Sequence, residues 1–166
     1  MSDTSTVPAV PRPSELWKQL SPERKQQAAE AFWHDENGGV EQAEALMAIA
    51  QRIKFRVKSV VGMPVEKKAK QLIALPVVSE MVAARLLVAY HLVHQRPMMG
   101  AFLDALGIKH EEGLISEEDI QPPDAEKLKA AAETLSAAYP PEDVKVYLTT
   151  LTWQDPDTWG GLAESL

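Results

Sequence analysis

Apolar residues recur along most of this 166-residue chain at the three- and four-residue spacing of helices with one buried face. The segments with this spacing are bounded by proline, glycine and short polar runs, which begin and end helices. The pattern therefore predicts an all-α fold, a single irregular bundle of six to eight helices. The predicted helical segments are 14–20, 22–35, 40–61, 64–75, 77–95, 97–107, 124–138 and 142–151, followed by a short turn around Trp159.

The segment 40–61 is open to two interpretations. Residues 52–58 alternate between basic and apolar side chains, which is the spacing of a β-strand. A helix places the other apolar residues of the segment on one face and leaves only Phe55 outside it. A lone strand without a partner is also not stable. We therefore predict one helix over 40–61, ended by Gly62.

Residues 108–123 lack helical spacing and are predicted to form a loop. They combine Gly113, an acidic run and two adjacent prolines, all of which favour irregular backbone. Leu114 and Ile115 are the apolar residues expected to pin this loop to the core.

The helix predicted over 77–95 carries the most informative pattern in the chain. We expect it to be the most buried element and to contact the helices at 40–61 and 97–107. Arg85 falls in the middle of its apolar side, and Leu87 lies on a narrow stripe opposite, together with Glu80, His91 and His94. The residues assigned to the apolar side are Val78, Met81, Val82, Leu86, Val88, Ala89, Leu92 and Val93.

An arginine among apolar residues has three interpretations. Its stem can lie on the core while its guanidinium reaches water. It can pair with a buried carboxylate, because an unpaired buried charge is unfavourable, and Asp104 and Glu66 are the candidate partners. It can also bind an anionic ligand, since the planar guanidinium suits carboxylate or phosphate.

His91 and His94 are the candidate metal ligands, because two histidines three residues apart share one helix face. A third ligand would have to come from elsewhere, and exposed histidines at a helix end are the simpler interpretation. No metalloprotease or di-iron motif surrounds the pair, and no cofactor is predicted. A speculative ligand-binding pocket combines Arg85, Tyr90, His91, His94 and Asp104.

Residues 1–13 are rich in Ser, Thr and Pro and are predicted to be a flexible tail before a single domain at 14–166. Pro8 and Pro11 beside Arg12 also have the spacing of a ligand for an SH3-type groove. The start lacks the basic and apolar regions of a secretory signal, so we expect a cytoplasmic protein. Pro76 and four titratable groups argue against a membrane span over 71–95.

Charge is unevenly distributed. The chain has a net charge of −7, yet residues 52–70 hold seven basic residues and one acidic residue. Residues 101–166 hold four basic and 14 acidic residues. An acidic protein is a poor general binder of nucleic acid. The basic block is interpreted first as a solvated face with salt-bridged neighbours. The alternative is a docking surface for an acidic partner, and the nearest candidate is the acidic C-terminal third of the same chain. The basic face comprises Arg52, Lys54, Arg56, Lys58, Lys67, Lys68 and Lys70.

These patterns favour a non-enzymatic helical interaction or regulatory module, with self-association or another protein as its partner. One alternative is a small-ligand binder or metal-dependent enzyme with the pocket at Arg85, His91 and His94. A second alternative is contact with an acidic partner or nucleic acid through residues 52–70. The chain has no cysteine and no glycine-rich phosphate loop, so thiol catalysis is excluded and P-loop chemistry is not indicated.

Overall fold

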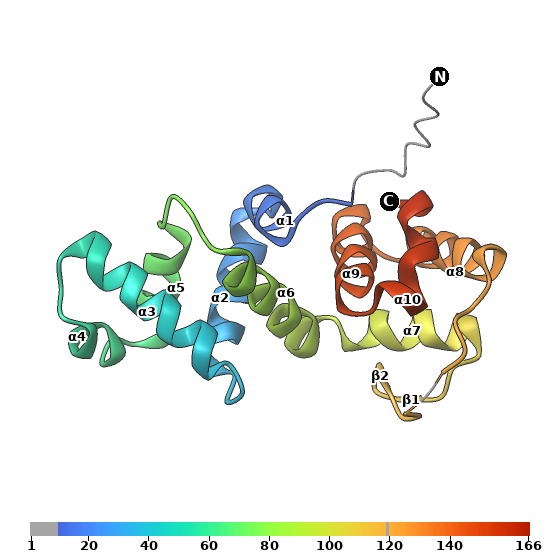
Figure 1. Cartoon of the computed structure of the whole chain (residues 1–166), viewed down its shortest axis with the longest axis horizontal. Coiled ribbons are helices and arrows are strands. Elements are labelled where there is room, and N and C mark those ends of the chain that lie inside the picture. Colours follow the sequence, from blue (N-terminus) through green and yellow to red (C-terminus); the bar gives the residue numbers. More distant parts are fainter. Residues whose placement is uncertain (1–9, 119) are drawn as a thin grey trace, which may run out of the picture. The chain divides into compact units, whose positions relative to one another are not determined.

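The computed structural model describes residues 10–118 and 120–166, and these form a helical protein. The described part contains ten α-helices, a 3-10 helix and a two-stranded antiparallel sheet, which confirms the all-α prediction. The elements gather into two compact units (Figure 1). The N-terminal unit is Arg12–His94, and the C-terminal unit is Gln95–Leu166 with the described residues just before Arg12. A single domain over 14–166 stays a prediction.

The N-terminal unit is built around α2, which packs against α5 and α6. Helix α6 also packs against α1 and α3. Phe32, Ile49, Leu72 and Leu86 are fully buried between these helices, so apolar burial holds the unit together. The six helices are α1 Pro13–Gln19, α2 Pro22–His34, α3 Gly39–Ile53, α4 Val57–Val61, α5 Val65–Ile73 and α6 Glu80–His94.

The prediction of one continuous helix over 40–61 is wrong. Helix α3 ends at Ile53, and Lys54 adopts a left-handed conformation with φ of 57°. The Phe55 N–H then donates to the Ala50 carbonyl, and the chain turns into α4. This turn lets α4 pack back on α3 and buries Val60, which a straight helix would carry past the core. The split is one reason why the helices outnumber the predicted six to eight.

Helix α6 is well buried, but the expectation that it is the most buried element is wrong, because seven of its 15 residues are buried against nine of 14 in α9. Its orientation also differs from the prediction. It begins at Glu80 because the Ser79 hydroxyl caps the Val82 N–H at 3.2 Å. Met81 and Val93 are exposed, whereas Leu87 and His91 are buried. Apolar residues nearly surround this helix, so spacing alone could not identify the face that α1 and α2 cover.

The predicted tail lies largely outside the described residues, and Pro8 is among those not described. Where the chain is described, α1 begins at Pro13, one residue before the predicted start of the domain. The Pro11 carbonyl accepts a 3.0 Å hydrogen bond from the Trp153 indole. The last residues assigned to the tail are therefore ordered.

The C-terminal unit packs α8 against α7, α9 and the 3-10 helix. Phe102 contacts Tyr147 and Trp159 with ring centroids 5.6 and 5.8 Å apart. Burial raises the pKa of the Tyr147 hydroxyl above its ordinary range, so it stays neutral at physiological pH. The elements are α7 Arg96–Leu106, β1 His110–Glu111, β2 Leu114–Ile115, α8 Ala125–Ala138, α9 Pro141–Gln154, α10 Pro156–Trp159 and η1 Gly160–Ser165.

Residues 108–123 are not wholly irregular, because β1 and β2 form a small hairpin within them. Glu112 and Gly113 make the turn with φ of 49° and 89°, and two positive φ values match the right-handed twist of paired strands. Glu111 pairs with Leu114 across the hairpin.

None of the helices formed by residues 10–118 and 120–166 combines the length and apolar character needed to cross a membrane.

We predict that Gly113→Ala destabilises the protein more than Gly107→Ala. Both glycines have positive φ, which disfavours alanine by roughly 1–2 kcal/mol. A Cβ at Gly107 meets nothing within 4 Å, whereas one at Gly113 would lie 2.6 Å from the Met99 Cβ. Overpacking should add about 1–3 kcal/mol for Gly113→Ala, measured by urea unfolding. Equal losses for the two variants would show that the hairpin does not rest on α7.

Candidate functional site

Arg85 is held by two carboxylates of its own unit. Its guanidinium nitrogens lie 3.9 Å from Asp35 Oδ2 and 3.6 Å from Glu41 Oε1. The two carboxylates are largely buried, and the Arg85 side chain is 31% exposed. Pairing with carboxylates is therefore correct among the three interpretations, but the candidate partners Asp104 and Glu66 are wrong. Asp35 and Glu41 lie at the corner between α2 and α3. No spacing in the sequence indicates that this corner is close to α6.

Gln42 strengthens this corner. Its side-chain amide donates to the carbonyls of Phe32 and Asp35 at 2.7 and 2.8 Å. Both carbonyls lie at the end of α2, where they also accept hydrogen bonds from the N–H groups of Asp35 and Gly38 at 3.3 and 3.5 Å. The amide of Gln42 and the charge of Arg85 thus fix where α3 leaves α2.

Tyr90 and His91 are buried, and His94 is exposed near the end of α6. The Tyr90 ring contacts both imidazoles, with centroids 5.7 Å from His91 and 5.6 Å from His94. His91 is therefore a core residue, which contradicts the simpler interpretation of two exposed histidines.

Asp104 belongs to the C-terminal unit and binds His110 there. The Gly113 N–H donates to Nδ1 of His110 at 3.0 Å, so the ring proton lies on Nε2. Nε2 donates to the Asp104 carboxylate at 2.7 Å. His110 therefore ties the hairpin to α7. The predicted five-residue ligand pocket stays a prediction.

No group of three His, Asp or Glu residues in the described part of the chain is arranged to hold a metal ion. The predicted metal ligands His91 and His94 both contact Tyr90, and no third ligand accompanies them among those residues.

The seven residues of the predicted basic face divide into two groups. Lys68 lies over the Trp33 ring at 5.1 Å, and Lys70 pairs with Glu66 at 3.5 Å, so contacts within the unit explain these two lysines on α5. Lys67 is exposed beside them. The other group surrounds α4, and in the part of the chain that the structure describes no ion pair engages its members, Arg52, Lys54, Arg56 and Lys58.

Three apolar side chains are exposed among these four basic residues. Phe55 is 53% exposed, and Val57 and Val61 are exposed to a similar degree. Figure 1 shows α4 at the end of the N-terminal unit that is farthest from α1. We name this region the basic–apolar surface, and it comprises Arg52, Lys54, Phe55, Arg56, Val57, Lys58 and Val61.

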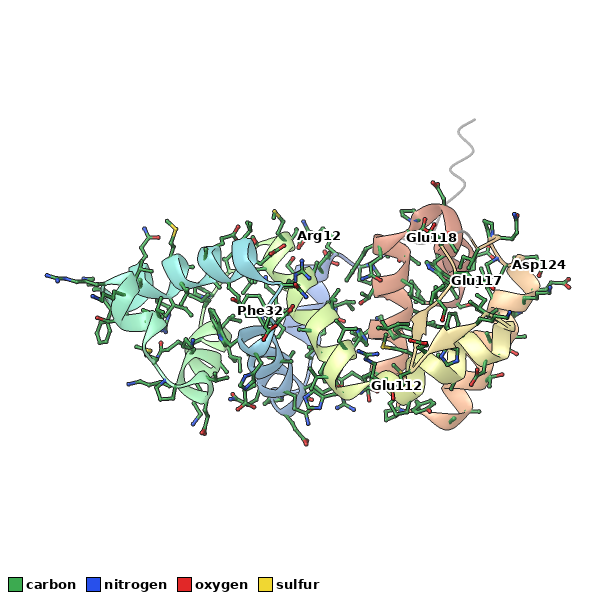
Figure 2. All side chains as sticks on the ribbon, turned by 90° about the horizontal axis from the view of Figure 1, so that it is seen from below. Arg12, Phe32, Glu112, Glu117, Glu118 and Asp124 are labelled. Carbon is green, nitrogen blue, oxygen red and sulfur yellow. The ribbon has the colours of Figure 1, made fainter. Side chains whose placement is uncertain are left out.

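A surface of opposite charge lies on the C-terminal unit. Leu114 and Ile115 on β2 are 43% and 38% exposed, although they were predicted to pin a loop. Figure 2 labels three of the acidic residues, Glu112 at the hairpin turn and Glu117 and Glu118 beyond β2. We name this region the acidic–apolar surface, and it comprises Glu111, Glu112, Leu114, Ile115, Glu117 and Glu118.

The acidic–apolar surface was not predicted, because 108–123 was interpreted as a loop. The signal was present in the glycine-containing turn between two short segments, His110–Glu111 and Leu114–Ile115. Strands of two residues are too short for the alternation that identifies longer ones.

Comparison of the chain with protein-family models, with curated proteins and with solved structures finds no match.

We predict that Arg85→Met lowers the free energy of unfolding by about 1–3 kcal/mol, because Asp35 and Glu41 lose their charged partner. Methionine keeps much of the stem, so the loss reports on charge more than on packing. In an Asp35→Asn/Glu41→Gln background, Arg85→Met should lower the free energy of unfolding by less than half as much. Urea unfolding of the four proteins in this double-mutant cycle measures the difference. Arg52→Met is the matched control at an exposed position. An equal loss in both backgrounds would assign Arg85 a packing role.

Proposed function

We propose that the protein is a helical interaction module that binds an acidic protein partner through the basic–apolar surface. The observation that carries this proposal is the exposure of Phe55, Val57 and Val61 among four basic residues that no ion pair engages in the described part of the chain. An exposed aromatic flanked by cations is suited to anchoring a partner, because it adds apolar contact to charge attraction.

The charges alone have a simpler explanation. Basic residues at the end of α3 are favourable beside the negative end of the helix dipole. That effect requires no exposed apolar neighbours. The helix dipole therefore accounts for Arg52 and Lys54 but leaves the exposed Phe55 ring unexplained. A surface that binds a partner explains both the basic residues and the exposed ring.

The alternative of a ligand or metal pocket around Arg85 has less support. Asp35 and Glu41 already engage the guanidinium, and Tyr90 and His91 are packed in the core. Nucleic-acid contact is the other alternative, and its weakness is the net charge of −7. We also propose that the module has a regulatory role and that it acts in the cytoplasm.

We predict that a labelled acidic amphipathic peptide, with glutamates on one helix face and leucines on the other, binds the full chain in fluorescence anisotropy. Lys54→Glu/Lys58→Glu should weaken binding at least tenfold, about 1.4 kcal/mol. Phe55→Ala should weaken binding too, because it removes the aromatic anchor but no charge. High salt should weaken the charge contribution.

The matched control is Lys127→Glu/Lys129→Glu, which makes the same charge change at two exposed lysines of α8 and should leave binding unchanged. A peptide with glutamine for glutamate and a duplex DNA serve as comparison probes. Absence of saturable binding, or equal binding by the Lys54→Glu/Lys58→Glu variant, would reject the proposal. Tighter binding of DNA than of the acidic peptide would replace it with the nucleic-acid alternative.

A further inference from the structure

The acidic–apolar surface is rigidly supported. Gly113 is buried at the hairpin turn, where a Cβ would meet Met99 and the Arg96 carbonyl. The Arg96 guanidinium donates to the Glu112 carbonyl at 3.2 Å, and His110 links Asp104 to the Gly113 N–H. The hairpin is therefore fixed on α7 by both of its strands and its turn, although it exposes two large apolar side chains.

Carboxylates lie close to those apolar side chains along the hairpin. Glu111 pairs directly with Leu114 across the hairpin, and Glu117 follows Ile115 by two residues. Across residues 95–166 the sequence has five basic and 14 acidic residues, so the surrounding surface adds to the negative potential. Although Arg96 also reaches this hairpin, the carboxylates outnumber it, so a basic partner suits Leu114 and Ile115 better than an acidic one.

The chain itself carries a surface of that description. The basic–apolar surface has four cations around three apolar side chains, and the acidic–apolar surface has four carboxylates around two. A shallow depression lies beside β2, and its lining residues are Arg96, Glu111, Glu112, Leu114, Ile115 and Ser116.

We infer that the acidic partner is a second copy of this chain, whose acidic–apolar surface receives the basic–apolar surface of the first. The inference rests on the proposed function and names its partner. The two surfaces differ, so the contact is heterologous: two copies close into a dimer by exchanging both contacts, or further copies add head to tail.

The test measures the mass of the full chain by sedimentation velocity across a range of concentrations, at low and high salt. Wild-type protein should associate at low salt and dissociate as salt screens the charges. Lys54→Glu/Lys58→Glu leaves Arg52 and Arg56 beside two new carboxylates, so the basic–apolar surface loses its net charge. Glu111→Lys/Glu117→Lys leaves Glu112 and Glu118 beside two new lysines, so the acidic–apolar surface loses its net charge. Each variant alone should raise the dissociation constant at least tenfold.

An equimolar mixture of these two variants is the decisive sample. The Lys54→Glu/Lys58→Glu variant keeps the native acidic–apolar surface, and the Glu111→Lys/Glu117→Lys variant keeps the native basic–apolar surface. These two native surfaces can meet in the mixture, so association should return. The control pairs are Lys127→Glu/Lys129→Glu and Glu133→Lys/Glu164→Lys, which change equal charge at exposed positions outside both surfaces and should still associate. Circular dichroism of every variant checks that the helices are retained.

A wild-type chain that stays monomeric at all concentrations overturns the inference, as does a mixture that fails to associate. The wild-type chain could stay monomeric and still bind the acidic peptide through Lys54 and Lys58. That result would reject a second copy as the partner but would leave the proposed function standing. Association that neither variant weakens, together with no peptide binding, would reject both.

Discussion

The N-terminal unit depends on the corner between α2 and α3. Arg85 on α6 reaches Asp35 at the end of α2 and Glu41 in the first turn of α3, while Gln42 binds the last carbonyls of α2. The carboxylates are largely removed from water, and such groups are stable only with a charged or hydrogen-bonding partner. Since three helices contribute to this cluster, it sets the direction in which α3 leaves the core.

The direction of α3 in turn places the basic–apolar surface. A helix of 15 residues spans about 22 Å, so a small change of angle at the corner moves its far end by several ångströms. At that far end Lys54 turns the chain through a left-handed conformation, and α4 buries Val60 while leaving Val57 and Val61 outside. The same turn that completes the local core therefore exposes the apolar side chains that lack a partner within the unit.

The sequence predicted what depends on local spacing and failed where distant segments decide. Ser21, Asp124 and Gly107 mark helix ends by capping and left-handed geometry, and the helices beside them begin or end there. The partners of Arg85 could not be predicted, because they come from a corner some fifty residues upstream. His91 looked exposed for a related reason: apolar residues surround α6, so only the packing of α1 and α2 selects its buried face.

In the proposed pairing of two copies, charge segregation between the two units would make contact through the exposed apolar side chains specific. Two basic–apolar surfaces repel each other, and so do two acidic–apolar surfaces, so like-to-like pairing of Phe55 or Leu114 is disfavoured. Only the pairing of a basic–apolar surface with an acidic–apolar surface combines apolar contact with charge attraction. The net charge of −7 adds a general repulsion between copies, which salt weakens together with the specific attraction. In the proposed pairing, repulsion between like surfaces would therefore act together with attraction between unlike surfaces in selecting the partner.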